Sequence, residues 1–120
     1  MKLLLFVIFL LTSFCKFAFS DENQIIALGD IEYGEYIGAE CSSCHHQSGA
    51  SEGIPSIHGM DAEVFVALML AYRSKEMENP VMQMIAGRLD DEQIGSLALY
   101  FSRLEPPEWS YFHLLKLKIW

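Results

Sequence analysis

Apolar residues recur every three or four positions in three stretches of this chain: residues 30–40, 61–74 and 90–104. This is the period of an amphipathic helix with one buried face. Asp30 opens the first stretch and Asp90 or Asp91 the last, where an aspartate side chain can cap free backbone N–H groups. The pattern therefore predicts a small all-α domain.

The first predicted helix carries two glycines, Gly34 and Gly38, on one face. A glycine in a helix interior costs about 1 kcal/mol relative to alanine, so a pair of them calls for a structural reason. We expect the last helix to approach this face closely, with Tyr100 or Phe101 lying over it. The alternative is that both glycines are loop residues.

The stretches between the predicted helices contain residues that favour loops. Residues 47–59 are rich in Gly, Ser and Pro. Residues 75–80 are mostly polar or charged, and Pro80 biases Asn79 away from helical conformations. We therefore expect residues 81–85 to begin as a loop.

The two ends of the chain differ from the domain between them, residues 21–105. Residues 1–20 have the parts of a secretory signal peptide: Lys2, an apolar run, and small residues ending at Ser20, after which we expect cleavage. The alternative is a retained anchor, although the unbroken apolar run is shorter than the ~20 residues a bilayer core requires. These features predict export to the periplasm.

Residues 106–120 form a tail that begins with Pro106 and Pro107, which should stop a helix. From Leu115 onward, apolar residues alternate with two lysines. The tail is too short to span a bilayer. Three roles remain open for it: packing across the edge of a cofactor, docking to a partner subunit, and surface association with a membrane.

The charge balance narrows the classes of partner. The chain has sixteen acidic and eight basic residues. Removing Lys2 and Lys16 with the signal leaves a net charge of −10. Nucleic acid selects the opposite balance. The excess of acid favours a partner with a basic surface, or serves solubility alone.

The run Cys41-Ser-Ser-Cys44-His45 has the spacing at which a c-type haem is attached covalently. Two thiols three positions apart can form thioethers with the two vinyl groups of one porphyrin. The adjoining imidazole of His45 would then be the proximal ligand of the iron. One such motif predicts one haem.

Three other readings of the motif are a disulfide, half of a zinc site and a thioredoxin-like redox pair. Zinc needs four ligands, and the only other cysteine is Cys15, inside the predicted signal. A redox pair should accompany a βαβ pattern, which the sequence lacks. Haem is therefore the favoured interpretation.

A ligating histidine usually donates its second ring N–H to an acceptor. The carbonyl of Pro55 is well placed for this in the loop after the motif, although Pro55 can equally be a simple turn residue. The neighbouring His46 cannot share the iron face that His45 holds. We expect His46 to be exposed to solvent or to cover the haem edge.

Methionine opposite histidine is the axial pair that raises the potential of cytochromes c. The residues able to supply it are Met60, Met69, Met77, Met82 and Met84, with His58 and His113 less suited. Met82 fits best because it follows Pro80 and precedes the final helix by a short linker. Met60 and Met84 remain the alternatives, while Met69 suits packing on an apolar helical face.

Several short runs resemble the class I cytochrome c subunit of flavocytochrome c sulfide dehydrogenase. They are Cys41 to His45, Gly53-Ile-Pro-Ser-Ile57 with Gly59, Phe65 to Ser74, Pro80-Val-Met82, Ile85-Ala86 and Asp91-Glu-Gln-Ile94. The resemblance covers residues 30–104. It implies a fold of three to four helices wrapped around one covalent haem, with thioethers at Cys41 and Cys44, proximal His45 and axial Met82. The family's glycine after the haem histidine is His46 here, which bears on haem-edge contacts more than on ligation.

The resemblance further implies a partner. In that family an FAD-containing flavoprotein subunit oxidises sulfide and passes electrons to the cytochrome, so this chain would hold no substrate site of its own. The same motif also permits a free soluble cytochrome c that carries electrons to a terminal oxidase or reductase. A haem sensor with an open iron face is a third reading.

Overall fold

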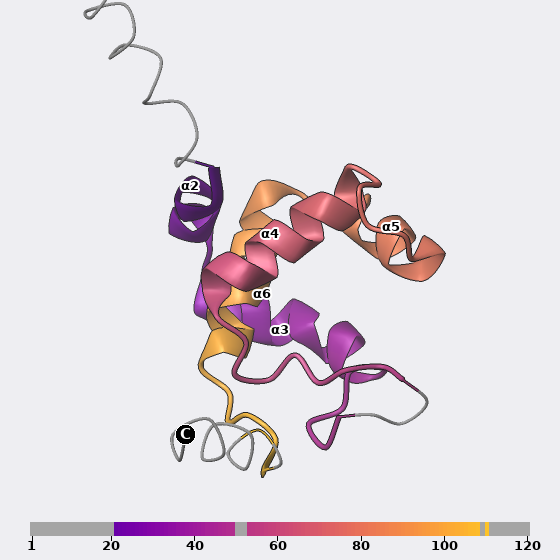
Figure 1. The fold of residues 1–120 in the computed structure, drawn as a ribbon. Helices are drawn as coiled ribbons and strands as arrows, with labels where there is room; N and C mark the ends of the chain where they lie inside the picture. Colours follow the sequence, from indigo (N-terminus) through magenta and orange to yellow (C-terminus); the bar gives the residue numbers. More distant parts are fainter. Residues whose placement is uncertain (1–20, 50–52, 109, 111–120) are drawn as a thin grey trace, which may run out of the picture.

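The computed structural model describes residues 21–49, 53–108 and 110. The described chain forms the α-helices α2 (Asp21–Leu28), α3 (Ile31–Ser42), α4 (Ala62–Arg73), α5 (Pro80–Ala86) and α6 (Asp91–Ser102), shown in Figure 1. No β-strand occurs among these residues. The all-α prediction is confirmed. The predicted signal peptide and most of the tail lie outside the described residues. Among the helices that are described, none has the length and apolar character of a membrane span.

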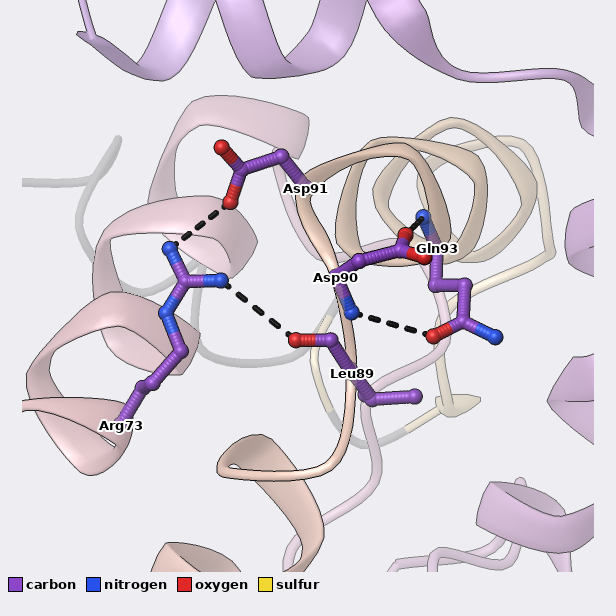
Figure 2. A network of polar contacts seen from close by, with 5 residues as sticks. All are labelled: Arg73, Leu89, Asp90, Asp91 and Gln93. Atoms are coloured by element: carbon purple, nitrogen blue, oxygen red, sulfur yellow. Dashed lines mark hydrogen bonds and ion pairs between the residues drawn. The ribbon is translucent and has the colours of Figure 1, made fainter.

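The three helices predicted from the apolar period are present, and each follows an aspartate that caps it. Asp30 accepts a hydrogen bond from the Tyr33 N–H at 2.8 Å, and Asp61 caps α4 in the same manner. Asp90 and Gln93 form a reciprocal capping box at the start of α6 (Figure 2), which satisfies two backbone donors together. Local capping chemistry therefore sets where these helices begin.

Two helices were not predicted, so the described chain has more than the three to four expected. One is α2, whose Ile25 is buried against α6. The other is α5, which corrects the prediction that residues 81–85 begin as a loop. Pro80 is the first residue of α5 rather than a helix breaker, because the first helical position needs no N–H donor.

Helix α6 is the centre of the domain, and α2, α3 and α4 all pack against it. Its residues Ile94, Leu97, Ala98 and Phe101 are almost completely buried. The Phe65 ring of α4 stacks on the Phe101 ring, with centroids 5.9 Å apart. One continuous apolar core therefore joins the helices that lead to and from the Cys41 to His45 motif.

The close approach expected at the glycine face is confirmed. A Cβ atom on Gly38 would lie 3.0 Å from atoms of the Tyr100 ring, and one on Gly34 would collide with the backbone of Ser96. The Ser96 hydroxyl in turn accepts a hydrogen bond from the Asp30 N–H at 2.9 Å. Helix α3 is thereby fixed against α6 along the face that leads to the motif.

Arg73 connects the end of α4 to the segment where the linker after α5 enters α6. Its guanidinium forms an ion pair with Asp91 at 2.8 Å and donates to the Leu89 carbonyl oxygen at 3.4 Å (Figure 2). Both charged side chains are partly exposed, so the pair itself contributes little to stability. Its effect is to fix the segment that connects α5 to α6.

Candidate haem site

The motif lies at the C-terminal end of α3, where a hydrogen-bonded turn follows the helix. The backbone N–H groups of Cys44 and His45 both donate to the Cys41 carbonyl oxygen, at 3.2 and 2.9 Å. Cys41 packs against the apolar core, whereas Cys44 is exposed, and neither is in a disulfide. The turn thus brings two free thiols and an imidazole together on the same short segment.

The two thiols differ in their surroundings. Burial raises the pKa of the Cys41 thiol above its ordinary value, and the neighbouring Glu40 carboxylate adds to this. Both effects disfavour the thiolate. Cys41 is therefore held as a neutral thiol at the edge of the core.

His45 lies against the loop that follows the motif. Its Nδ1 is 2.6 Å from the Pro55 carbonyl oxygen, so Nδ1 carries the proton and donates to that carbonyl. Of the two roles that the sequence left open for Pro55, acceptor and simple turn residue, the structure shows the acceptor contact. It leaves Nε2 of the neutral ring as the atom able to bind a metal, in an orientation fixed by the loop.

These donors fit a covalently attached haem. Thioether formation needs two free thiols at this spacing, and axial ligation needs an imidazole whose other nitrogen is hydrogen-bonded. Cys41, Cys44 and His45 provide both. In the described part of the chain, no three His, Cys, Asp or Glu side chains are grouped to hold a bare metal ion.

The methionines proposed for the opposite iron face lie in different environments. Met82 is half-buried and packs against the core, whereas Met84 is 57% exposed. Because these two residues are two positions apart in the helix α5, their side chains point in different directions. Met60 also packs against the core but belongs to the loop that carries Pro55, and Met69 is buried in α4.

In the view of Figure 1, α5 projects on the same side of the molecule as the C-terminal end of α3. These two segments are distant in sequence, and α3 and α5 do not pack directly against each other. The other histidines differ from His45. His46 is exposed, and His58 packs beside the Phe101 ring with centroids 5.9 Å apart.

Sequence reasoning missed two polar residues beside Met82. The Asn79 side chain accepts hydrogen bonds from the N–H groups of Val81 and Met82, and the Gln83 side chain donates to the Met77 carbonyl oxygen. Asn followed by Pro is the residue pair expected at the N-cap and first position of a helix, so this signal was present in the sequence.

Comparison with known proteins shows a similarity to a bacterial electron-acceptor protein. The chain is 30% identical over 73 residues to the thiosulfate dehydrogenase electron acceptor of Stutzerimonas stutzeri, a match that covers 58% of this chain. It spans about a third of that protein, 34% of its length. No protein-family model matches the chain. The similarity is thus to part of a protein named as an electron acceptor.

Proposed function

We propose that this chain is a monohaem c-type cytochrome that transfers single electrons. The observation that carries the proposal is the Cys41 to His45 motif at the end of α3, with His45 Nδ1 engaged by Pro55 and Nε2 left to bind iron. Similarity to a protein named as an electron acceptor supports the same role.

Each residue of the site has a defined part. Cys41 and Cys44 would hold the porphyrin through thioethers, and His45 and Met82 would bind the iron. With both ligands bound, the iron would have no position open for a substrate. A haem bound in this way supplies a one-electron Fe(III)/Fe(II) couple, so the chain's task is transfer rather than substrate chemistry.

The donor we propose is a dehydrogenase that oxidises an inorganic sulfur compound. Resemblance to the flavocytochrome c subunit points to an FAD-containing flavoprotein that oxidises sulfide, whereas the similar curated protein is named for thiosulfate dehydrogenase. We propose the sulfide-oxidising flavoprotein as donor, in the periplasm after removal of residues 1–20. The alternative is a free carrier that delivers electrons to a terminal oxidase or reductase.

The haem assignment is tested with protein matured in a host that has haem-attachment machinery. We expect a coloured product whose haem stays with the chain after denaturation, and whose Cys41 and Cys44 resist alkylation. A colourless product with both thiols open to alkylation would overturn the proposal. A five-coordinate high-spin ferric spectrum would instead favour a haem sensor.

The partner is tested by reduction of the purified ferric cytochrome. A sulfide-oxidising flavoprotein supplied with sulfide should reduce it, and a thiosulfate dehydrogenase supplied with thiosulfate serves as the comparison. Faster reduction by the latter would replace the proposed donor. Reduction by neither enzyme, with a normal haem spectrum, would leave the free carrier as the function.

A further inference from the structure

Helix α5, which carries Met82, is held by few contacts. Of the helices that the structure describes, only α4 packs against α5. The side chains of Val81 and Met84 on α5 are 63% and 57% exposed. Apart from the packing of Met82 itself and of the buried Ala86, the start of α5 is attached to the preceding segment by polar contacts.

Asn79 makes the most direct of these contacts. Its backbone is extended, with φ −164° and ψ 103°, and its side-chain oxygen accepts from the N–H groups of Val81 and Met82, both at 3.1 Å. Pro80 has no N–H, so these are the first two donors of the helix. One amide oxygen thus binds the backbone of Met82 itself.

A second set of hydrogen bonds attaches the same turn to α4. Gln83 Nε2 donates to the Met77 carbonyl oxygen at 2.8 Å. The N–H groups of Glu76 and Met77 both donate to the Ala71 carbonyl oxygen of α4, at 2.9 and 3.2 Å. Residues on both sides of Met82 in the sequence are therefore connected to the rigid part of the domain.

We propose that Asn79 is a positioning residue that holds Met82 on the iron. The inference rests on the proposed function, in which Met82 is an axial ligand. Without the Asn79 oxygen, the Val81 and Met82 N–H groups lose their partner and the first turn of α5 frays. The methionine sulfur then leaves the iron more often, and a competing ligand can replace it. Groups that orient metal ligands have effects on affinity of about 10- to 100-fold.

The structure offers a matched control. Asp61 caps α4 with the same pattern of hydrogen bonds, because one side-chain oxygen accepts from the N–H groups of Glu63 and Val64 at 3.0 and 3.2 Å. Asp61→Ala removes two capping bonds from a helix that does not carry Met82. Both variants should lose comparable thermal stability, but only a change at Asn79 should loosen the methionine ligand.

The experiment measures how tightly the ferric holoprotein binds added imidazole, which competes for the methionine position. We expect Asn79→Ala to bind imidazole about 10-fold more tightly than wild type, whereas Asp61→Ala stays within about 2-fold. Asn79→Ser retains a capping oxygen and should restore the wild-type affinity. If Asn79→Ala gives no holoprotein, Asn79→Gly removes the same oxygen at a smaller cost to the helix.

Equal imidazole affinities for Asn79→Ala and Asp61→Ala, or no rescue by Asn79→Ser, would overturn the positioning role. The wild-type spectrum separates this failure from failure of the proposed function. A ferric wild-type protein without the methionine-to-iron band near the red end of the spectrum would refute the axial assignment of Met82, and the role of Asn79 with it.

Discussion

Gly34 in α3 lies directly against Ser96 in α6, so closely that a Cβ atom on Gly34 would fall 2.6 Å from the Ser96 carbonyl carbon. The two backbones are in contact at this point because Gly34 has no side chain. Asp30, just before α3, donates its N–H to the Ser96 hydroxyl at 2.9 Å. The same residue of α6 therefore holds both the start and the first turn of the helix that leads to the Cys41 to His45 motif.

Replacing Gly34 by alanine tests this contact, because the closeness of the two helices decides whether the change raises or lowers the free energy of unfolding. At an open helix position the change stabilises by about 1 kcal/mol. Here the added methyl must push α3 from α6, at a cost of about 1–3 kcal/mol for an overpacked site. We expect a net loss in the free energy of unfolding, measured by urea denaturation of the holoprotein.

The exposed Ala39, also in α3, provides the reference for that measurement. Ala39→Gly should lower the free energy of unfolding by about 1 kcal/mol through helix propensity alone. If Gly34→Ala instead stabilised the protein by the amount that Ala39→Gly destabilises it, the two helices would not be in close contact.

The methionine assignment predicts different outcomes for two neighbouring positions. Met82→Ala should abolish the methionine-to-iron band of the ferric protein and lower the reduction potential, because methionine opposite histidine raises it. Met84→Ala should preserve both, since the Met84 side chain is 57% exposed. Visible spectra and potentiometric titration measure these properties. A band that survives in Met82→Ala would make Met60 or Met84 the ligand, and Met60→Ala would decide between them.

Much of this fold follows from local sequence signals. The spacing of Ile94, Leu97 and Phe101 in α6, like the aspartates before the helices, is a property of a few consecutive residues. The glycine pair of α3 also pointed to its partner, because a costly residue in a helix needs a reason. Such features need no knowledge of distant contacts.

The errors in prediction have a physical cause as well. Helix α2 is short and is stabilised by burying Ile25 against α6, a tertiary contact that apolar spacing over eight residues does not reveal. At α5, Asn79 has the extended backbone expected before Pro80, but residues 81–85 form a helix rather than a loop, because an Asn-Pro pair also starts helices. The need of a ligating imidazole for an acceptor made the Pro55 carbonyl one of two roles open to Pro55, and the structure shows that contact with His45. The hydrogen bond from the Met82 N–H to Asn79 is known from the structure alone.

The charge distribution predicts how salt affects electron transfer. Residues 21–72, which include the motif, contain nine acidic residues and no lysine or arginine. The rate of reduction by a positively charged metal complex should fall as ionic strength rises, and the rate with a negatively charged complex should increase. Stopped-flow absorbance measures both rates.

Two charge-reversal variants show which part of the chain causes this salt dependence. Glu40→Lys changes the residue just before the motif, and Glu92→Lys makes the same change in charge at the start of α6. We expect the larger loss of salt dependence in Glu40→Lys. Equal effects would mean that only net charge matters, and not the charge next to the motif.

The buried imidazole nitrogen of His58 leads us to expect that the stability of the fold changes with pH. Its Nε2 is buried without a hydrogen-bond partner among the described residues, and burial lowers the pKa of the imidazole below its ordinary value. The unfolded chain therefore takes up a proton more readily than the folded one, so stability falls as pH drops through the unfolded pKa of about 6.5. We expect His58→Gln to lose less free energy of unfolding than wild type between about pH 7 and pH 5.

The exposed His46 supplies the control, because His46→Gln removes an imidazole without changing a buried group. Urea denaturation at a series of pH values gives the free energy of unfolding for each variant, and the comparison rests on the difference from wild type. His46→Gln removes a histidine from both the folded and the unfolded chain, so the pH dependence of this variant is the reference for that of His58→Gln. If the free energy of unfolding of both variants changes with pH as that of wild type does, His58 is not held neutral by burial. The packing beside Phe101 then admits its charged form.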